Sequence, residues 1–266
     1  MIPLALSAAT PAVFISYSAL SDYKKPSAGQ LIIRDLSFTI FWCILSYILT
    51  SAYSNPPDFL TWFGFTITVD NYGAMLSCCS VIFVIYIGPL VQTAFIEDEG
   101  EEFNLPELKS YVTDAFCEEA FFRTCHINFL LASGFGFNGC VFVSMIIYTA
   151  VKCRNIFLGL NFQNAIKHGK IWGLGQEVFF NLLLGWMLGY MYVRTASYLA
   201  CVIVHVFKNF MGFPDIGFYK PTHGLYSKKW IIGAAYCVGI VGFVFLFNLI
   251  LMNPEIFEPW HARLAI

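Results

Sequence analysis

Long apolar segments separated by short polar connections run through the whole chain. A membrane-spanning helix needs about 20 mainly apolar residues, and eight segments come near this description. They extend over Pro3 to Leu20, Leu36 to Tyr53, Ala74 to Phe95, Tyr111 to Leu131, Gly139 to Val151, Trp172 to Val193, Ser197 to Met211 and Trp230 to Met252. The fifth and seventh are the shortest. The pattern predicts an all-α, polytopic integral membrane protein with about eight transmembrane helices.

Turn-forming residues occupy the connections between these segments. Examples are "SNPPD" at 54–58 and "GFPDIGFYKPTHG" at 212–224, and an acidic run, "EDEGEE", occupies 97–102. Proline and glycine at such places end helices. The first segment has neither a positively charged start nor a small-residue cleavage site, so we interpret it as a span and not as a signal peptide. We treat residues 1–266 as a single membrane domain.

The composition supports a membrane protein and argues against one class of partner. The chain is 58% hydrophobic and 12% charged, whereas soluble domains have roughly 45–50% apolar and about 25% charged residues. The formal net charge is −2, and the Lys and Arg residues are scattered, with no basic stripe. We therefore expect a lipid bilayer around the protein and no nucleic acid partner.

The cationic residues also give an orientation. When the chain alternates sides through eight spans, most Lys and Arg residues fall on one face, which the positive-inside rule assigns to the cytosol. Arg194 and Arg263 fall on the opposite face, while Arg123 and Lys208 lie inside predicted spans. Ionisable side chains within a membrane are costly and mark a functional site by default.

Polar residues concentrate in the fourth and seventh predicted spans. These spans contain Asp114, Glu118, Glu119, Arg123, His205, Lys208 and Asn209. On a helix Glu119 and Arg123 lie one turn apart on the same face, so we expect an ion pair between them, whereas Glu118 points about 100° away. The pair is structural in this interpretation, which leaves Glu118 available for another role.

His205 and Asn209 are also one helical turn apart, so both project into the same space. A carboxylate facing a His and an Asn on another helix can form a hydrolytic site. Glu118 can take a proton from water, and His205 with the Asn209 amide can stabilise the oxyanion formed when a carbonyl is attacked. Two structural alternatives remain open: Glu118 is a polar packing group, and His205 and Asn209 only form hydrogen bonds between helices.

The same residues resemble the motifs of the type II CAAX prenyl protease family, the Ras-converting CAAX endopeptidases. The segment "EEAFFR" at 118–123 matches EExxxR, and "HVFKNFMGFPD" at 205–215 matches HxxxN with its "MGFP" tail. The stretches "YIGPLVQ" at 86–92 and "YMYVRTASYL" at 190–199 are similar to those that precede the two motifs in eukaryotic members. Residues 86–215 are therefore the core that carries the resemblance.

The resemblance implies a fold, an activity and a set of roles. It implies a multi-pass protease of the endoplasmic reticulum membrane, with a mid-membrane polar cavity, that removes the C-terminal tripeptide from isoprenylated CAAX proteins. Glu118 would be the water-activating base, Glu119 and Arg123 the supporting pair, and His205 and Asn209 the oxyanion stabilisers. Farnesylated or geranylgeranylated CAAX proteins such as small GTPases would be the partners. No cofactor and no metal are expected, and no HExxH motif occurs.

One motif of the family is missing. The family has FxxxH followed by further histidines between the two motifs, and its first His shares the activation of the water. The corresponding stretch here, "VSMIIYTAVKCRNIF" at 143–157, contains no His; an ungapped placement puts Ala150 at the first position, with Lys152 and Cys153 at the following ones. Because a single catalytic group contributes about 10²–10⁴ in rate, we expect a large loss of activity.

Two other classes of function stay open for this reason. One is a catalytically impaired family member that binds or scaffolds prenylated proteins, and the other is a small-molecule transporter with a polar pocket. For a prenylated peptide, the basic groups near Lys152 and Arg154 would suit the C-terminal carboxylate. We interpret the remaining histidines as ordinary surface or interfacial residues: His126, His168, His223 and His261.

Overall fold

The computed structural model describes residues 2–20, 27–52, 55–65, 69–96, 104–154, 171–253 and 256–257. Within these ranges the protein is all-helical, with no β-strand, as the sequence predicts. The elements are α1 (Ile2–Leu20), α2 (Ala28–Ser51), α3 (Phe59–Phe63), α4 (Val69–Ile85), α5 (Ile87–Thr93), α6 (Leu105–Leu108), η2 (Lys109–Thr113), α7 (Asp114–Glu119), η3 (Ala120–Ile127), α8 (Asn128–Ala132), α9 (Phe137–Lys152), α12 (Ile171–Thr195), α13 (Tyr198–Met211), η4 (Ile216–Tyr219), η5 (Tyr226–Lys228), α14 (Lys229–Leu246) and η6 (Phe247–Leu251).

Apolar helices make the fold compatible with a membrane protein. In the part of the chain that the structure describes, α2 and the stretch Tyr226–Leu251 are long and apolar enough to cross a membrane. Tyr72–Ile85 and Ile87–Thr93 add a third candidate if this pair, bent by 58°, forms one span. The eight apolar segments predicted from the sequence all lie largely in helix. Eight spans are not confirmed, because several of these helices are shorter than a span.

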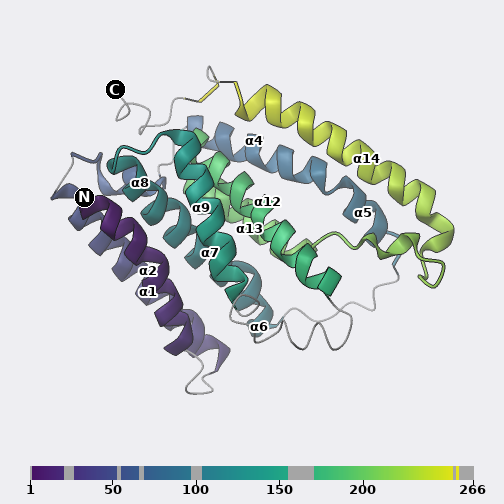
Figure 1. Ribbon diagram of the computed structural model, residues 1–266, viewed down its shortest axis with the longest axis horizontal. Coiled ribbons are helices and arrows are strands. Elements are labelled where there is room, and N and C mark those ends of the chain that lie inside the picture. The colour runs from purple at the N-terminus through teal and green to yellow at the C-terminus, as the bar shows by residue number, and fades with distance from the viewer. Residues whose placement is uncertain are drawn as a thin grey trace.

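A helix of several connected elements runs through the middle of the molecule (Figure 1). It consists of α6, η2, α7, η3 and α8, and it contacts α1 and α2 on one side and α9, α12 and α13 on the other. α4, α5 and α14 pack together at the far side of α13. The candidate site residues of the fourth predicted span are therefore enclosed between two groups of helices.

This central helix begins with a capping box and contains two wide turns. Asn104 accepts from the backbone N–H of Glu107, whose side chain accepts from the backbone N–H of Asn104. η2 and η3 are π-helical, so α7 is a short α-helical piece between them. The hydroxyl of Tyr198 donates to the carbonyl of Phe116 at 2.8 Å, which helps to satisfy the backbone near the second wide turn.

α2 begins earlier than the apolar pattern predicts. It starts at Ala28 and not at Leu36, because Ser27 and Gln30 form a capping box ahead of it. Arg34 and Asp35 consequently lie within the helix and not in a connection. Because the first turns of the helix contain polar residues, the hydrophobic pattern alone does not show where the helix begins.

α9 and α12 pack closely through two glycines of α12. A side chain at Gly185 would meet Tyr148 at 3.1 Å and the backbone of Met145 at 3.3 Å, and one at Gly189 would meet Val141 at 3.8 Å. Glycines four residues apart let helix backbones approach in this way. The contact holds α9 with its other face toward the central helix.

The start of α13 is fixed by a close backbone approach at Gly64. This glycine has φ of 77°, its carbonyl accepts from the N–H of Tyr198 at 3.0 Å, and an added Cβ would collide with the carbonyl oxygen of Ala196. Ser197 then caps α13 by accepting from the N–H of Ala200 at 3.3 Å. These contacts place α13, and with it His205, against the central helix.

Candidate functional site

Two neighbouring carboxylates on α7 end in different surroundings. The side chain of Glu119 is 0% exposed. The side chain of Glu118 is 9% exposed and lines a cavity. The divergence predicted from helix geometry is therefore present, since adjacent residues on a helix point about 100° apart.

The predicted ion pair between Glu119 and Arg123 is present and completely enclosed. Arg123 donates from Nε to Oε2 of Glu119 at 3.0 Å, and both side chains are 0% exposed. Arg123 also donates from Nη1 to the Ser144 hydroxyl at 2.9 Å and lies 4.9 Å from the ring centroid of Tyr148. Two residues of α9, Ser144 and Tyr148, thus contact the Arg123 guanidinium in addition to Glu119. A buried charge needs such partners.

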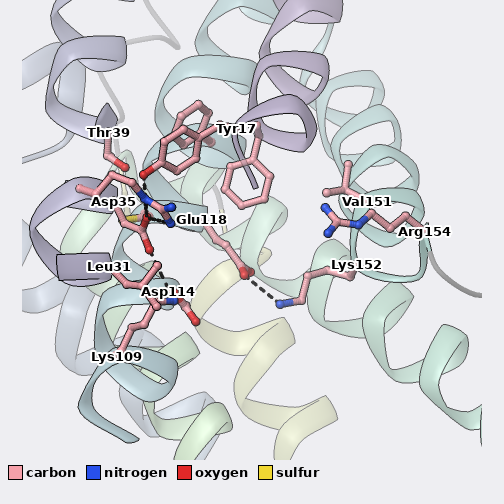
Figure 2. Close-up of a pocket in the computed structure, with 14 residues that line it drawn as sticks. Tyr17, Leu31, Asp35, Thr39, Lys109, Asp114, Glu118, Val151, Lys152 and Arg154 are labelled. Carbon is pink, nitrogen blue, oxygen red and sulfur yellow. Dashed lines mark hydrogen bonds and ion pairs between the residues drawn. The ribbon is translucent and has the colours of Figure 1, made fainter. Parts of the chain in front are cut away.

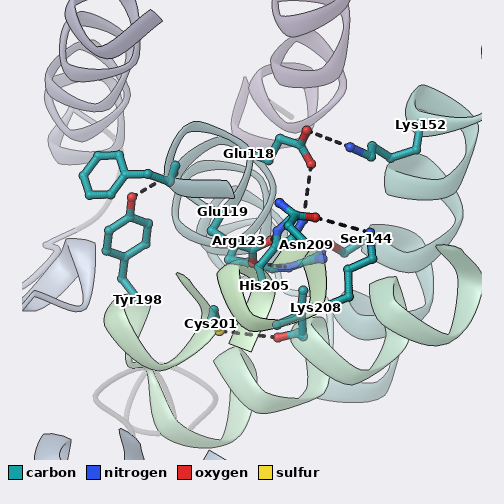
Figure 3. A network of polar contacts seen from close by, with 12 residues as sticks. Glu118, Glu119, Arg123, Ser144, Lys152, Tyr198, Cys201, His205, Lys208 and Asn209 are labelled. Carbon is teal, nitrogen blue, oxygen red and sulfur yellow. Dashed lines mark hydrogen bonds and ion pairs between the residues drawn. The ribbon is translucent and has the colours of Figure 1, made fainter. Parts of the chain in front are cut away.

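His205 joins the two carboxylates. Its Nδ1 lies 2.7 Å from Oε1 of Glu119, and its Nε2 lies 3.8 Å from Oε2 of Glu118 (Figure 3). An ionised carboxylate only accepts hydrogen bonds, so Nδ1 carries the hydrogen. Nε2 is then the free ring atom, which accepts a proton when the ring is neutral and donates one when it is charged.

Two buried polar atoms therefore face one another without a hydrogen bond. Oε2 of Glu118 and Nε2 of His205 have no hydrogen-bond partner, and the 3.8 Å between them is too long for a direct bond. Buried polar atoms are normally paired, and a gap of this kind is where a water is expected. A water oxygen beside the pair can contact both atoms, which is the arrangement that general-base chemistry needs.

Lys152 at the end of α9 holds the other oxygen of Glu118. Its Nζ lies 2.8 Å from Oε1 of Glu118 (Figures 2 and 3). Ser144, Tyr148 and Lys152 are spaced by four residues, so one face of α9 meets the central helix. Ala150 is exposed on another side of α9. The position that contacts Glu118 is therefore Lys152 and not Ala150, where the ungapped placement puts the missing His.

Sequence reasoning missed the partnership of Lys152 with Glu118. The sequence places Lys152 near the missing motif and suggests it as a basic group for the C-terminal carboxylate of a prenylated peptide, not as a partner of Glu118. The periodicity of Ser144, Tyr148 and Lys152 was an available signal. This periodicity points to Glu118 only when it is known which face of α9 lies toward Arg123.

Asn209 lies one turn after His205 on α13, as predicted, but its amide is already engaged. Nδ2 donates to the carbonyls of Ser110 and Tyr111, both at 3.3 Å, and Oδ1 accepts from Nζ of Lys208 at 3.3 Å. These bonds are long for N–H···O contacts. They tie α13 to the beginning of the central helix.

A cavity of about 460 Å³ opens beside Glu118 (Figure 2). Half of the residues that line it are charged, and Figure 2 shows Lys152 and Arg154 on one side of Glu118 and Asp35, Asp114 and Lys109 on the other. Tyr17 and Phe121 add aromatic surface. A cavity with many charged groups is therefore present, and Glu118 lies between its two walls.

A second cavity, of about 320 Å³, is almost entirely apolar. Side chains of α4, α12, α14 and the loop after α13 line it, among them Phe180, Trp186, Phe213 and Phe243. Lys208 is its charged member, with Nζ 4.2 Å from the ring centroid of Phe213. Lys208 is 9% exposed, so it lies between this cavity and the buried site and does not extend to a lipid interface.

The other histidines that the structure describes, His126 and His223, do not lie in the site. His126 is fully buried and contacts the Ser7 carbonyl through Nδ1 at 2.9 Å, so its interpretation as a surface or interfacial residue is wrong. His223 pairs with Asp215 at 3.3 Å in the loop after α13. His168 and His261 lie outside the described residues. Within those residues no cluster of three or more His, Cys, Asp or Glu side chains is placed to hold a metal ion.

Comparison with known proteins supports the family resemblance. Residues 108–211 match the family model described as type II CAAX prenyl endopeptidase Rce1-like. The chain is 26% identical over 147 residues to CAAX prenyl protease 2 of Arabidopsis thaliana, a match that covers 54% of this chain and 43% of that relative. The match thus spans less than half the length of the relative. No solved structure matches the chain significantly.

The family match contains every residue of the candidate site. Glu118, Glu119, Arg123, His205 and Asn209 all fall between residues 108 and 211. The cavity beside Glu118 is also lined mainly by residues of this region and of α2. Residues 108–211 are thus similar to the type II CAAX prenyl endopeptidase Rce1-like family.

Proposed function

We propose that this protein is an intramembrane endopeptidase that removes the C-terminal tripeptide from isoprenylated CAAX proteins. The family match and the name of the Arabidopsis relative support this class of substrate. The observation that carries the proposal is the unpaired couple of Glu118 Oε2 and His205 Nε2, 3.8 Å apart beside a polar cavity. We further propose a multi-pass protein of the endoplasmic reticulum membrane with eight spans, acting on farnesylated or geranylgeranylated proteins such as small GTPases.

In the proposed mechanism Glu118 is the general base. A water beside Oε2 gives a proton to Glu118 while its oxygen attacks the scissile carbonyl, which becomes a tetrahedral oxyanion. When the C–N bond breaks, Glu118 returns the proton to the leaving amine of the tripeptide. The carbonyl side keeps the new carboxylate, so atoms and charge balance over the cycle.

His205 has one of two alternative uses in this scheme. Glu119 fixes the ring through Nδ1, so Nε2 stays directed toward Glu118. If the ring is neutral in the free protein, Nε2 accepts a hydrogen bond from the attacking water; if the ring already carries its second proton there, Nε2 donates to the oxyanion. In both cases Glu118 takes the proton of the water.

Asn209 is the second proposed oxyanion donor. Its amide donates over 3.3 Å to two backbone carbonyls. An oxyanion is a stronger acceptor than a carbonyl. Exchange of one of these long bonds for the oxyanion therefore costs little, and the other keeps α13 attached to the central helix.

Cleavage of a farnesylated CAAX peptide by the purified full-length protein tests the proposal. We expect release of the tripeptide and a loss of about 10²–10⁴ in kcat in Glu118→Gln, which keeps the side-chain size but removes the base. Glu177→Gln, at an exposed carboxylate on α12, is the matched control and should cleave at the parent rate. Turnover that is unaffected by Glu118→Gln would contradict the mechanism.

A second candidate function is supported by one observation. Lys152 occupies Oε1 of Glu118 in an ion pair of 2.8 Å, and a carboxylate that stays paired in this way is a poor base. The candidate is a catalytically impaired family member that binds or scaffolds prenylated proteins. Tight binding of the farnesylated peptide without any release of tripeptide would favour it, and release that depends on Glu118 would exclude it.

A further inference from the structure

Lys152 lies at the border between the buried carboxylates and the open cavity. Its side chain is 30% exposed, whereas that of Glu118, its partner at 2.8 Å, is 9% exposed. Figure 2 shows Lys152 extending from its own wall of the cavity toward Glu118, with Arg154 on the same wall. The ammonium group can therefore be reached by a molecule in the cavity while it contacts the candidate base.

The cations on the opposite wall are paired with carboxylates that have no part in the proposed chemistry. Arg34 pairs with Asp35 at 2.8 Å, and Lys109 pairs with Asp114 at 2.7 Å and with Asp35 at 3.4 Å. Lys152 differs because the carboxylate that holds it is Glu118. Occupation of Lys152 and the availability of Glu118 are therefore linked.

A second carboxylate enters the cavity if the proposed function is correct. The tripeptide to be removed ends in a free α-carboxylate, about 10 Å from the scissile bond when the peptide is extended. Lys152 cannot contact Glu118 and the substrate α-carboxylate at the same time, because Glu118 points into the site and the α-carboxylate lies beyond it. Lys has a long flexible side chain, so a swing between the two positions needs no change in the backbone.

We propose that Lys152 is a positioning residue that exchanges Glu118 for the α-carboxylate of the substrate. In the free protein it holds Glu118 as an ion pair. A bound C-terminal carboxylate draws Lys152 away from Oε1 of Glu118 and toward Arg154, so the carboxylate loses this cation and Oε2 becomes a stronger base when the correct chain end is in place. The proposal rests on the proposed function, and it assigns to Lys152 the recognition of a free carboxyl terminus.

Binding of two matched peptides tests the exchange without any turnover. The probe is a farnesylated CAAX peptide with a non-hydrolysable ketomethylene group in place of the scissile amide, as the free acid and as the C-terminal amide. We expect the full-length protein in micelles to bind the acid about tenfold more tightly, which corresponds to one charge-assisted contact. Lys152→Met should bind both peptides equally, and Lys152→Arg should keep the preference.

Two further variants separate this role from a structural one. Glu118→Gln releases Lys152, so it should strengthen binding of the acid and leave binding of the amide unchanged. Lys220→Met removes the same charge at an exposed site in the loop after α13 and should keep the tenfold preference. Because each variant is judged by its own ratio of two affinities, a general loss of stability does not imitate the expected result.

The outcomes distinguish this proposal from the proposed function. A preference for the acid that survives in Lys152→Met overturns the exchange, and so does a gain in Glu118→Gln for both peptides alike. If the natural peptide is cleaved and either of these results is found, the exchange is overturned and the proposed protease function is supported. The expected binding pattern without cleavage supports the exchange and overturns the protease. Failure to bind either peptide overturns both.

Discussion

Two sets of charged side chains stand beside each other in this protein and differ in their access to water. The buried network contains Glu119, Arg123, Ser144 and His205, in which Glu119 and Arg123 are 0% exposed. The cavity wall contains Arg34, Asp35, Lys109 and Asp114, whose side chains are between 11% and 36% exposed. The two sets contain similar residue types, so the difference lies in enclosure.

Enclosure decides what each set can do. Charges without access to water cannot exchange partners without a large cost, so the buried network fixes the ring of His205. Charges at the cavity can be solvated or can pair with a bound molecule, so they can change partners during a reaction. Glu118 belongs to both environments, with His205 behind it and Lys152 in front. A residue that must hold its position and also exchange a proton is suited to this border.

The largest effect is expected from breaking the buried network. Arg123→Met leaves the Glu119 charge buried with His205 as its remaining cationic partner. We expect a loss of about 3–5 kcal/mol in the free energy of unfolding, measured by denaturant titration in micelles. Ser144→Ala, which removes one hydrogen bond to Arg123, should lose only about 1 kcal/mol. Equal losses in the two variants would show that the charge is not enclosed.

A smaller effect is expected at the cavity wall. Lys109→Met removes contacts to Asp114 and Asp35, but Asp114 is 36% exposed and Asp35 keeps Arg34 at 2.8 Å and the Tyr17 hydroxyl at 2.6 Å. The carboxylates left behind can therefore be solvated or paired. The same titration should show a loss of about 1 kcal/mol or less. A loss as large as that of Arg123→Met would remove the distinction between the two sets.

The smallest effect is expected at the edge of the buried network. The Tyr148 hydroxyl is buried without a hydrogen-bond partner, and its ring packs on Arg123 at 4.9 Å. Tyr148→Phe keeps the ring and removes the unpaired group, so unfolding should show no loss and a gain of up to about 1 kcal/mol. Tyr192→Phe, which removes a donor to Asn128 at 3.3 Å, is the control and should lose about 1 kcal/mol. A clear loss in Tyr148→Phe would mean that its hydroxyl has a partner after all.

Contacts within one helix could be predicted from the sequence. The pair of Glu119 and Arg123 follows from their spacing of four, and the divergence of Glu118 follows from helix geometry. The meeting of the two motifs rested on the family resemblance, and the structure brings His205 against both carboxylates. The all-helical class followed from the apolar segments.

Contacts between helices could not be predicted in the same way. Lys152 reaches Glu118 because Gly185 and Gly189 set the distance and rotation of α9 against α12, which no local pattern in α9 reveals. Asn209 bonds to Ser110 and Tyr111 because the central helix extends back past the apolar segment to Leu105. In both cases the missing information was the relative position of two elements.

The two π-helical turns divide the central helix into short pieces. Wide turns are where helices bend and rotate most readily, and η2 and η3 stand on either side of the six residues of α7. Beyond η3, α8 is anchored, since Asn128 donates to the Trp62 carbonyl at 2.9 Å and accepts from Tyr192. The carboxylates therefore sit on a six-residue α-helical segment between two wide turns, and Tyr198 of α13 holds this segment through the Phe116 carbonyl.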